Sequence, residues 1–478
     1  MSKSENETSL MTLSEVLSSV SGTVLGSCSE CYFTSVETDS RNVRKDTLFV
    51  PLVGTVQDGH RYVSQAADKG ASVILVNREA AEENRKEYEH LSEKGVLFVV
   101  VENTLYGLQN LAEGYVNKFP KLLKIGITGS CGKTTTKEML VSVMKQKFNC
   151  VYTKGNFNSE TGLPLSVFQI RKEHECGIFE MGMNRENEIG EISKVLKAEY
   201  ALITNIGTAH IGILGNRENI AREKRKIFDY IPKNGAAFVP SDDDFASFVT
   251  ENVKGKKVFF GIKVPEAENG ARLVKENGLT GIEFVLDGVP VNLPVSGLYN
   301  YQNALGVAAL AKELGLTAKE IKAGLESFRN VGGRMEVFQA ESKNGKKITV
   351  VKDCYNANPD SMQKVIELCL AQKTEGSVVF VLGDMKELGD KASESHRKII
   401  ALVSGSDAEA AFVGTDFESE KGTAEKDFYW CETVEDEGLS TYVLSKIEEG
   451  SVLLLKGSNS MKLWNLLPEV IEIKEETE

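Results

Sequence analysis

The residues of this sequence best suited to chemistry lie in one glycine-rich stretch, residues 126–136 (GITGSCGKTTT). It falls between a predicted strand at residues 124–128 and a predicted helix at 134–148. Backbone amides in such a turn, together with the helix N-terminus, form a site for anions. Lys133 would add a positive charge for terminal phosphates and Thr134 a hydroxyl ligand for Mg²⁺. The stretch predicts ATP binding, although the first glycine of the usual GxxxxGK[ST] pattern would fall at Ile127. The alternative is a tight turn with a chance Gly-Lys pair.

Two other polar residues follow predicted strands. Glu180 ends a strand at residues 177–181, and His210 follows a strand at 201–205. In an open parallel sheet, ligands gather at the carboxyl ends of the strands. Oxygen and imidazole ligands suit Mg²⁺ or Mn²⁺ bridging nucleotide phosphates. Taken alone, His210 would be a buried or loop histidine. The polar loop at residues 154–158 could orient a phosphate or carboxyl group, or be an ordinary turn.

The elements that must position these residues alternate between short apolar strands and longer helices, which indicates α/β layers with largely parallel sheets. The 478 residues suggest about three domains. We place them at residues 1–103, 104–328 and 329–478. The sequence pattern changes over residues 241–297, and Asp287-Gly288 predicts a hairpin. We therefore interpret this part as an antiparallel elaboration of the central domain. Further strands are predicted at 47–52, 71–76, 96–101, 150–153, 236–240, 348–352, 378–382, 410–413 and 452–455, and further helices at 62–69, 105–119 and 301–314.

Net charge, apolar runs and cysteine content limit the classes of protein to which this chain could belong. The net charge of −13 argues against a nucleic-acid binder. Residues 1–10 lack an apolar signal region, and the longest apolar runs are too short to span a membrane, so we expect a cytoplasmic protein. Its eight cysteines should then be reduced thiols. Cys28 and Cys31 form a CxxC pair without a matching second pair, which favours plain thiols over a zinc site.

Nine motifs follow one another along the chain: TGSCGKTTT, TKGNFNSETGLP, EMGMN, TNIGTAHI, YNYQNAL, GRMEV, DCYNANPDSM, LGDMKELG and LLKGS. This is the order found in Mur ligases, and the chain resembles that family from about residue 38 to residue 462. Residues 38–41, Phe49 and residues 57–60 resemble its uridine-nucleotide domain. The resemblance implies an N-terminal α/β uridine-nucleotide domain, a central P-loop ATPase domain and a C-terminal Rossmann-like domain. It also implies an ATP- and Mg²⁺-dependent ligase of peptidoglycan synthesis. Such a ligase would join D-alanyl-D-alanine to UDP-N-acetylmuramoyl-tripeptide through an acyl phosphate. We expect the protein to be a monomer.

The same resemblance implies roles for nucleotide and metal ligands. Thr134 and Glu180 would bind one Mg²⁺, and His210 would help to hold a second. Lys224 matches a lysine that is carbamylated in the family near that second ion; without the resemblance it reads as a solvated helix lysine. With Lys133 and His210 it would be catalytic. ATP would be held by Gly129, Ser130, Cys131, Gly132, Lys133, Thr134, Thr135, Asn303 near adenine, Arg334 and Asp353.

Substrate contacts are implied in the same way. Ser40 and Arg41 would contact the uridine nucleotide, Asn156 and Asn158 the muramyl peptide. Asn356 and Asn358 would contact nucleotide or incoming peptide.

Two positions depart from the family pattern. Asn459 stands where Arg is usual, which puts one anion contact in doubt, and Ser159 stands where a second Asn is common.

Rival interpretations remain open. One is a sibling ligase, such as one that extends folate, although residues 39–41 argue against the folate type. Another is a nucleotide-operated switch or motor, and a third is a non-catalytic UDP-sugar-binding scaffold.

Overall fold

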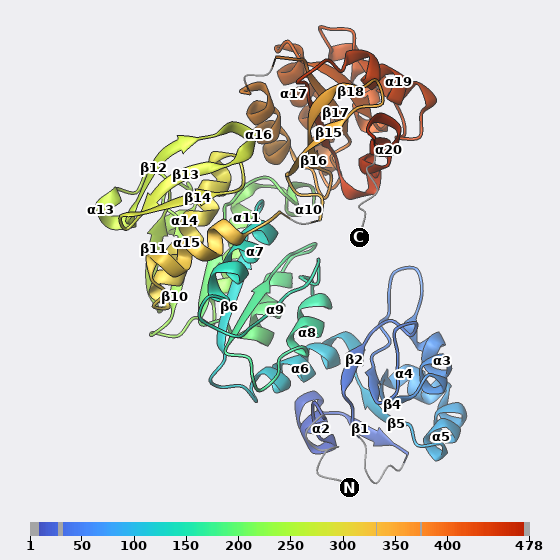
Figure 1. Ribbon diagram of the computed structural model, residues 1–478. Coiled ribbons are helices and arrows are strands. Elements are labelled where there is room, and N and C mark those ends of the chain that lie inside the picture. Colours follow the sequence, from blue (N-terminus) through green and yellow to red (C-terminus); the bar gives the residue numbers. More distant parts are fainter. Residues whose placement is uncertain (1–8, 27–31, 331, 373–374, 473–478) are drawn as a thin grey trace. The chain divides into compact units, whose positions relative to one another are not determined.

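The computed structural model describes residues 9–26, 32–330, 332–372 and 375–472 (Figure 1). The Cys28/Cys31 pair and the acidic tail after Glu472 lie outside them. The chain divides into two compact units. One comprises Met1–Gly126, Phe148–Ala201 and Lys226–Gly235; the other comprises Ile127–Lys147, Leu202–Arg225 and Ala236–Glu478. Within the described ranges, no helix combines the length and apolarity needed to cross a bilayer.

The N-terminal sheet has five strands in the order β1-β5-β4-β3-β2. The four strands β2 to β5 pair in parallel, and only β1 joins antiparallel to β5. The predicted strand at 47–52 ends at Phe49, and the predicted helix at 62–69 is a short 3₁₀ turn followed by α3. The elements are α2 Leu13–Val20, β1 Thr23–Leu25, β2 Ser35–Glu37, β3 Thr47–Phe49, η1 Gly59–Tyr62, α3 Val63–Asp68, β4 Ala71–Asn77, α4 Arg78–Glu83, α5 Arg85–Glu93 and β5 Leu97–Val101.

The central sheet has six strands in the order β11-β10-β9-β6-β8-β7. The helix predicted at 105–119 is α6, which begins after Asn103; this side chain accepts hydrogen bonds from the N–H groups of Leu105 and Tyr106 and caps the helix. The elements here are α6 Thr104–Val116, β6 Leu123–Thr128, α7 Lys133–Met144, β7 Cys150–Tyr152, α8 Gly162–Val167, β8 Cys176–Glu180, α9 Glu188–Leu196, β9 Tyr200–Ile203, α10 Ile211–Leu214, α11 Arg217–Lys224, η2 Arg225–Phe228 and β10 Ala236–Pro240.

The segment after β10 differs in part from the expected antiparallel elaboration. Its first strand, β11 (Lys256–Phe260), pairs in parallel with β10 and extends the central sheet. Only the next three strands form a separate antiparallel sheet, β12-β13-β14. Asp287 and Gly288 both have positive φ (46° and 79°) in its tight turn, which confirms the predicted hairpin.

That small sheet and its neighbouring helices complete this part of the chain. Strand β12 contains a bulge between Leu273 and Lys275. Helix α14 begins three residues before the predicted start at 301, and Gly315 follows it with φ 76°, as expected of a helix-ending glycine. The elements are α12 Ala246–Thr250, α13 Glu266–Asn269, β12 Ala271–Glu276, η3 Gly278–Thr280, β13 Ile282–Leu286, β14 Val289–Leu293, α14 Leu298–Glu313 and α15 Ala318–Ser327.

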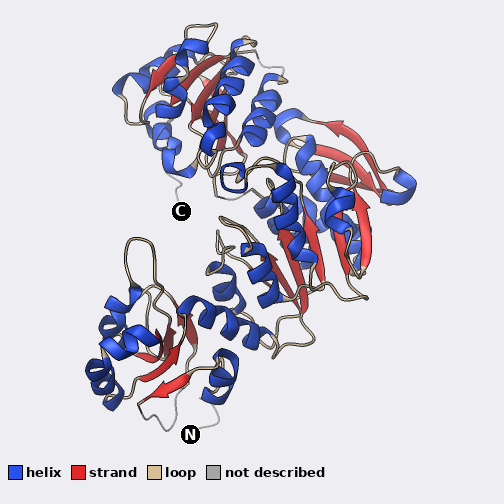
Figure 2. Cartoon of the chain, turned by 180° about the vertical axis from the view of Figure 1, so that it is seen from behind, coloured by secondary structure: helices blue, strands red, loops and turns tan. Residues whose placement is uncertain are grey.

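The C-terminal sheet has the order β15-β16-β20-β17-β18-β19, with β15 antiparallel and the other strands parallel. Helices flank its strands (Figure 2). All four strands predicted here are present. The elements are β15 Glu336–Glu341, β16 Lys347–Asp353, α16 Pro359–Leu370, β17 Val378–Gly383, η4 Gly389–Lys391, α17 Ala392–Ser404, β18 Glu409–Val413, α18 Thr415–Ser419, η5 Lys421–Thr423, β19 Tyr429–Cys431, α19 Glu437–Lys446, β20 Val452–Lys456, η6 Asn459–Met461, η7 Leu463–Leu466 and α20 Leu467–Val470.

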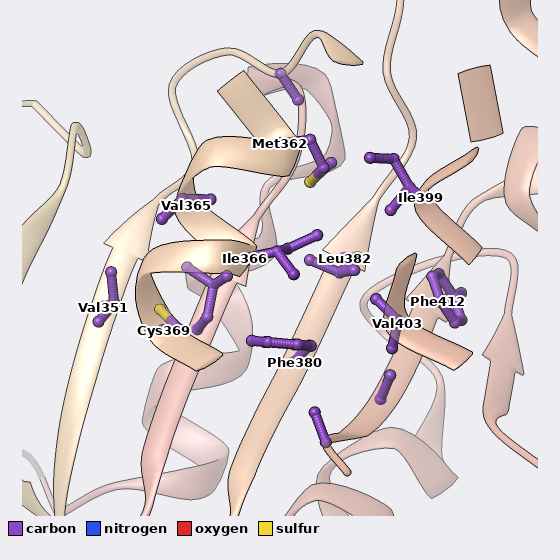
Figure 3. Packing of buried hydrophobic residues seen from close by; sticks show 14 of the residues in the cluster. Val351, Met362, Val365, Ile366, Cys369, Phe380, Leu382, Ile399, Val403 and Phe412 are labelled. Atoms are coloured by element: carbon purple, nitrogen blue, oxygen red, sulfur yellow. The ribbon is translucent and has the colours of Figure 1, made fainter. Parts of the chain in front are cut away.

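A core on one face of this sheet fixes helix α16. Its apolar residues recur at helical spacing and pack against strand residues that alternate with those facing the other side (Figure 3). Asn358, which begins α16, is therefore held by a buried framework. The packed residues of α16 are Met362, Val365, Ile366 and Cys369, and those of the strands include Val351, Phe380, Leu382 and Phe412.

Candidate active site

The phosphate loop follows strand β6 and leads into helix α7. Gly129 and Gly132 have positive φ (152° and 80°), a conformation that glycine adopts without a Cβ clash. A Cβ on Gly129 would lie 1.9 Å from Thr204 Oγ1, and one on Gly132 would lie 2.9 Å from Asn303 Nδ2. The predicted strand, glycine turn and helix are therefore present, and Asn303 lies beside the turn.

The segment after β9 holds this loop in place. The N–H of Ser130 donates to the Asn205 carbonyl oxygen (3.0 Å), and the N–H of Cys131 donates to Asn205 Oδ1 (3.1 Å). Asn205 Nδ2 and Thr204 Oγ1 both donate to the Cys131 carbonyl (2.9 and 2.5 Å). The loop is thereby shaped in advance for an anion, and Asn205 and Thr204 are site residues that the sequence reasoning missed.

Two lysines meet at one carbonyl of the loop. Lys133 Nζ and Lys224 Nζ each donate to the carbonyl oxygen of Gly129 at 2.9 Å. Lys224 is completely buried, so it is not the solvated helix lysine that its sequence context alone suggests. Burial, and then the charge of Lys133, hold the pKa of Lys224 well below its usual range. Burial thus favours the neutral form of an amine that lies against the phosphate loop.

His210 lies in the same compact unit. Its Nδ1 is 3.2 Å from Glu387 Oε2, but the atoms are not aligned for a hydrogen bond, and the buried Nδ1 has no such partner among the described residues. Burial lowers the pKa of His210, the neighbouring Glu387 opposes this, and the charges of Lys133 and Lys224 lower it further. His210 in turn lowers the pKa of Glu387. Burial therefore favours the neutral imidazole, the form that binds metal ions.

Residues of α16 contact the phosphate loop and the segment after β9. Asn358 caps α16 by accepting from the N–H of Ser361, and its Nδ2 lies 3.2 Å from Cys131 Sγ. Asp360 Oδ2 accepts from the N–H and the hydroxyl of Thr208 (2.9 and 2.8 Å). The structure thus brings Asn358 to the predicted nucleotide site, together with Asp360, for which the sequence reasoning had no role.

Three other predicted residues gather at the end of β16. Asp353 accepts from Lys456 Nζ (2.7 Å), which also donates to the carbonyl of Asn356 (3.0 Å). The guanidinium of Arg334 lies over the Tyr355 ring, 3.6 Å from its centroid. Lys456 thus holds Asp353 and the Asn356 carbonyl together, while Arg334 lies on the ring of the neighbouring Tyr355.

The other compact unit holds Glu180 at the end of β8. The carboxylate is 1 % exposed and accepts from Asn158 Nδ2 at 2.7 Å. The loop around Asn158 is fastened by the buried Glu188, which accepts from the N–H groups of Glu160 and Asn184. Asn158 therefore orients the Glu180 carboxylate, whereas the side chain of Asn156 in the same loop is exposed.

The predicted uridine-nucleotide residues lie in the N-terminal sheet domain. Ser40 Oγ donates to Gln65 Oε1 (2.7 Å) and is buried. Arg41 is exposed and pairs with Asp39 at 2.6 Å, which lowers the pKa of that carboxyl to about 2. Arg41 is thus an accessible cation whose partner a phosphate could replace.

Three family models match the chain. They are described as the Mur ligase family catalytic domain at residues 32–116, the Mur ligase middle domain at 127–311 and the Mur ligase glutamate ligase domain at 333–459. Together with full-length relatives, they show that the chain belongs to the Mur ligase family.

Its relatives include proteins named UDP-N-acetylmuramoyl-tripeptide--D-alanyl-D-alanine ligase. The one from Treponema pallidum is 40 % identical over 450 residues, covering 91 % of this chain and 93 % of the relative. That from Bacillus subtilis is 30 % identical over 447 residues, with coverages of 91 % and 93 %. A crystal structure of MurF from Acinetobacter baumannii has a TM-score of 0.84 at 29 % identity and covers 96 % and 98 % of the two chains. MurF ligase from Thermotoga maritima, solved with ADP, has a TM-score of 0.77 at 27 % identity, with coverages of 91 % and 96 %.

Proposed function

We propose that this chain is an ATP-dependent amide ligase that joins D-alanyl-D-alanine to UDP-N-acetylmuramoyl-tripeptide, forming ADP and phosphate, in peptidoglycan precursor synthesis. The observation that carries the proposal is the 40 % identity to a ligase of that name over nearly the whole chain. The phosphate loop, with Lys133 and Lys224 on the Gly129 carbonyl, supplies the matching chemistry. A domain at residues 1–103 would bind the uridine nucleotide, one at 104–328 would bind ATP, and one at 329–478 would take part in joining the peptides.

The reaction needs activation because a carboxylate would have to expel oxide to form an amide. A carboxylate oxygen of the tripeptide attacks the γ-phosphorus, ADP leaves, and an acyl phosphate forms. The amine of D-alanyl-D-alanine then attacks the acyl carbon, and phosphate leaves. The protein contributes positioning and charge neutralisation, with the amides of residues 129–135 and Lys133 on the phosphates.

The donor set fits Mg²⁺. His210 offers an imidazole whose Nδ1 faces Glu387 and whose Nε2 would be the metal ligand, and Glu180 is a buried carboxylate oriented by Asn158. Thr134 and Glu180 would hold one ion, and His210 with a carbamate on Lys224 a second. Bound Mg²⁺ would reduce the repulsion between the substrate carboxylate and the γ-phosphate. A carbamate forms when the neutral Nζ of Lys224 attacks CO₂ and loses a proton, which the lowered pKa of this amine favours.

The remaining site residues keep the roles that the resemblance implies. Asn303 beside Gly132 would approach the adenine, and Arg334 and Asp353 would reach the nucleotide. Substrate contacts would come from Ser40, Arg41, Asn156, Asn158, Asn356 and Asn358.

The deciding experiment measures phosphate release from ATP and Mg²⁺ with UDP-N-acetylmuramoyl-tripeptide, with and without D-alanyl-D-alanine. Release that needs both substrates, with an amide product of the summed mass less water, is the expected result. Phosphate release in the absence of both substrates would instead support a nucleotide-operated switch or motor. Uridine-nucleotide binding without phosphate release would support a scaffold, and release with another amine or acceptor would support a sibling ligase. We further propose a cytoplasmic monomer, to be checked by cell fractionation and by light scattering on the purified chain.

A further inference from the structure

His210 and Glu387 face one another although they are distant in the sequence. Besides the 3.2 Å approach of Nδ1 to Oε2, both residues have φ of 66°. Side-chain-bearing residues are uncommon in this left-handed region, and such strain is concentrated at functional sites. Both members of the pair therefore adopt an uncommon backbone conformation at the point where they meet.

The backbone sets the spacing of this pair. A Cβ on Gly212 would lie 2.6 Å from the Gly389 nitrogen and 2.8 Å from the Glu387 carbonyl oxygen. Gly389 itself has φ of 52°, and its Cβ would lie 3.1 Å from Gly212 Cα. The main chains of α10 and η4 thus touch directly, and no flexible side chain stands between them to alter the distance.

One nitrogen of the His210 imidazole, Nδ1, lies beside the Glu387 carboxylate, and the other, Nε2, is available for another contact. His210 is 13 % exposed, and its buried Nδ1 lacks an aligned hydrogen bond among the described residues. A small rotation of the ring or of the Glu387 carboxyl would let Nδ1–H donate to Oε2. That bond would fix the tautomer and leave the lone pair on Nε2, as carboxylates do for metal-binding histidines.

We propose that Glu387 is a positioning residue for His210: it accepts a hydrogen bond from Nδ1–H and so presents Nε2 to the divalent cation that accompanies ATP. The inference rests on the metal role given to His210 in the proposed function. Since Glu387 belongs to the C-terminal segment and His210 follows β9, this ligand is oriented only while α10 and η4 are in contact. The C-terminal segment thereby acts on the metal site without touching the metal.

The test compares full-length wild-type protein with Glu387→Gln, Glu387→Asp and His210→Gln. A matched control, Glu394→Gln, removes an exposed carboxylate from the same part of the chain. Mn²⁺ binding is measured by electron paramagnetic resonance with a non-hydrolysable ATP analogue. The tautomer is read by NMR of ¹⁵N-histidine-labelled protein, where five histidines give few signals and His210→Gln assigns one of them. Thermal unfolding checks that each variant is folded.

Glu387→Gln should weaken the His210-dependent Mn²⁺ site about 10- to 100-fold and shift the His210 ring signals toward a mixture of tautomers. Glu387→Asp should restore part of both effects, and Glu394→Gln should match wild type. Wild-type Mn²⁺ binding and an unchanged His210 signal in Glu387→Gln would overturn the inference. Weaker Mn²⁺ binding with an unchanged tautomer would also overturn it, because Glu387 would then be a ligand itself. If wild type and His210→Gln bind Mn²⁺ equally, the metal role of His210 in the proposed function fails instead.

Discussion

Lys224 donates a hydrogen bond to the carbonyl oxygen of Gly129 over 2.9 Å, across 95 positions of sequence. Lys133 uses the same carbonyl. Two amines on one acceptor repel each other when both are charged, and only Lys224 is sealed from water. The charge is therefore expected to reside on Lys133, where it serves phosphate, while Lys224 remains available as a nucleophile toward CO₂.

Lys224→Ala should lose most ligase activity, because the carbamate that would complete the second metal site cannot form. Short carboxylic acids added to the assay should restore part of the rate by occupying the space of the carbamate. Arg222→Ala, on the exposed side of the same helix, is the control and should retain activity. A fully active Lys224→Ala protein would exclude the carbamate.

The modification should depend on pH in a defined direction. Because the pKa of Lys224 is lowered in the folded protein, lowering the pH through that pKa protonates the amine and should release CO₂. Without CO₂, the unfolded chain binds more protons than the folded one between the lowered pKa and the usual lysine pKa, so stability should rise with pH across that window. NMR with ¹³C-bicarbonate should show a carbamate signal that fades on acidification and is missing in Lys224→Ala.

Lys133→Ala should reduce ADP formation by about 10²- to 10³-fold or more, since it removes a cation aimed at the charge that develops on the phosphates. The rate is measured as phosphate release with both substrates saturating. A companion measurement of unfolding temperature separates lost chemistry from lost folding. Near-normal turnover in a folded variant would contradict the phosphate-loop assignment.

Asn158→Ala should weaken Mg²⁺ binding, so that the enzyme needs more Mg²⁺, rather than abolish binding of the muramyl peptide. Its amide donates to Glu180 at 2.7 Å, and loss of such a partner costs about 10- to 100-fold in metal affinity or activity. A titration of activity against Mg²⁺ checks this, with Gln169→Ala as an exposed amide control. An unchanged Mg²⁺ requirement with a raised KM for the peptide substrate would favour the substrate role alone.

Asp360→Ala should loosen the segment from residue 205 to His210. The variant leaves the N–H and hydroxyl of Thr208 without their acceptor, at a cost of about 1–3 kcal/mol. Amide hydrogen exchange in this segment should accelerate, and phosphate release should slow because Ser130 receives its contact from the same segment at Gly207. Asp427→Ala, which removes an exposed carboxylate, should leave both unchanged. Equal exchange in the two variants would remove the proposed bracing role of Asp360.

Local signals in the sequence predicted local structure well. Strand β10 matches its predicted bounds, and the Asp287-Gly288 hairpin and the glycine turn before Lys133 are present. Strand β11 was misjudged because its partner, β10, lies outside the window that suggested a hairpin, and alternation of apolar residues does not report strand direction. Three-residue strands such as β1 carry too few residues for a pattern.

The site was predictable where a motif is contiguous and unpredictable where it depends on burial or distant contact. Lys224 stands in a run of charged residues, so its complete burial against Gly129 could not be read from the pattern, and only its role was expected from the family resemblance. Asp360 and Glu387 act on residues of the central segment through tertiary packing. No local spacing relates them to Thr208 or His210.

The small sheet β12-β13-β14 also bears on self-association. An uncovered sheet edge invites a strand from another molecule. On β14, Pro290 offers no N–H and its carbonyl accepts from Lys322, while the N–H of Asn292 donates to Glu326. On β12, the bulge after Leu273 interrupts the regular ladder. Both edges of the sheet are therefore poor templates for pairing with a strand of another molecule.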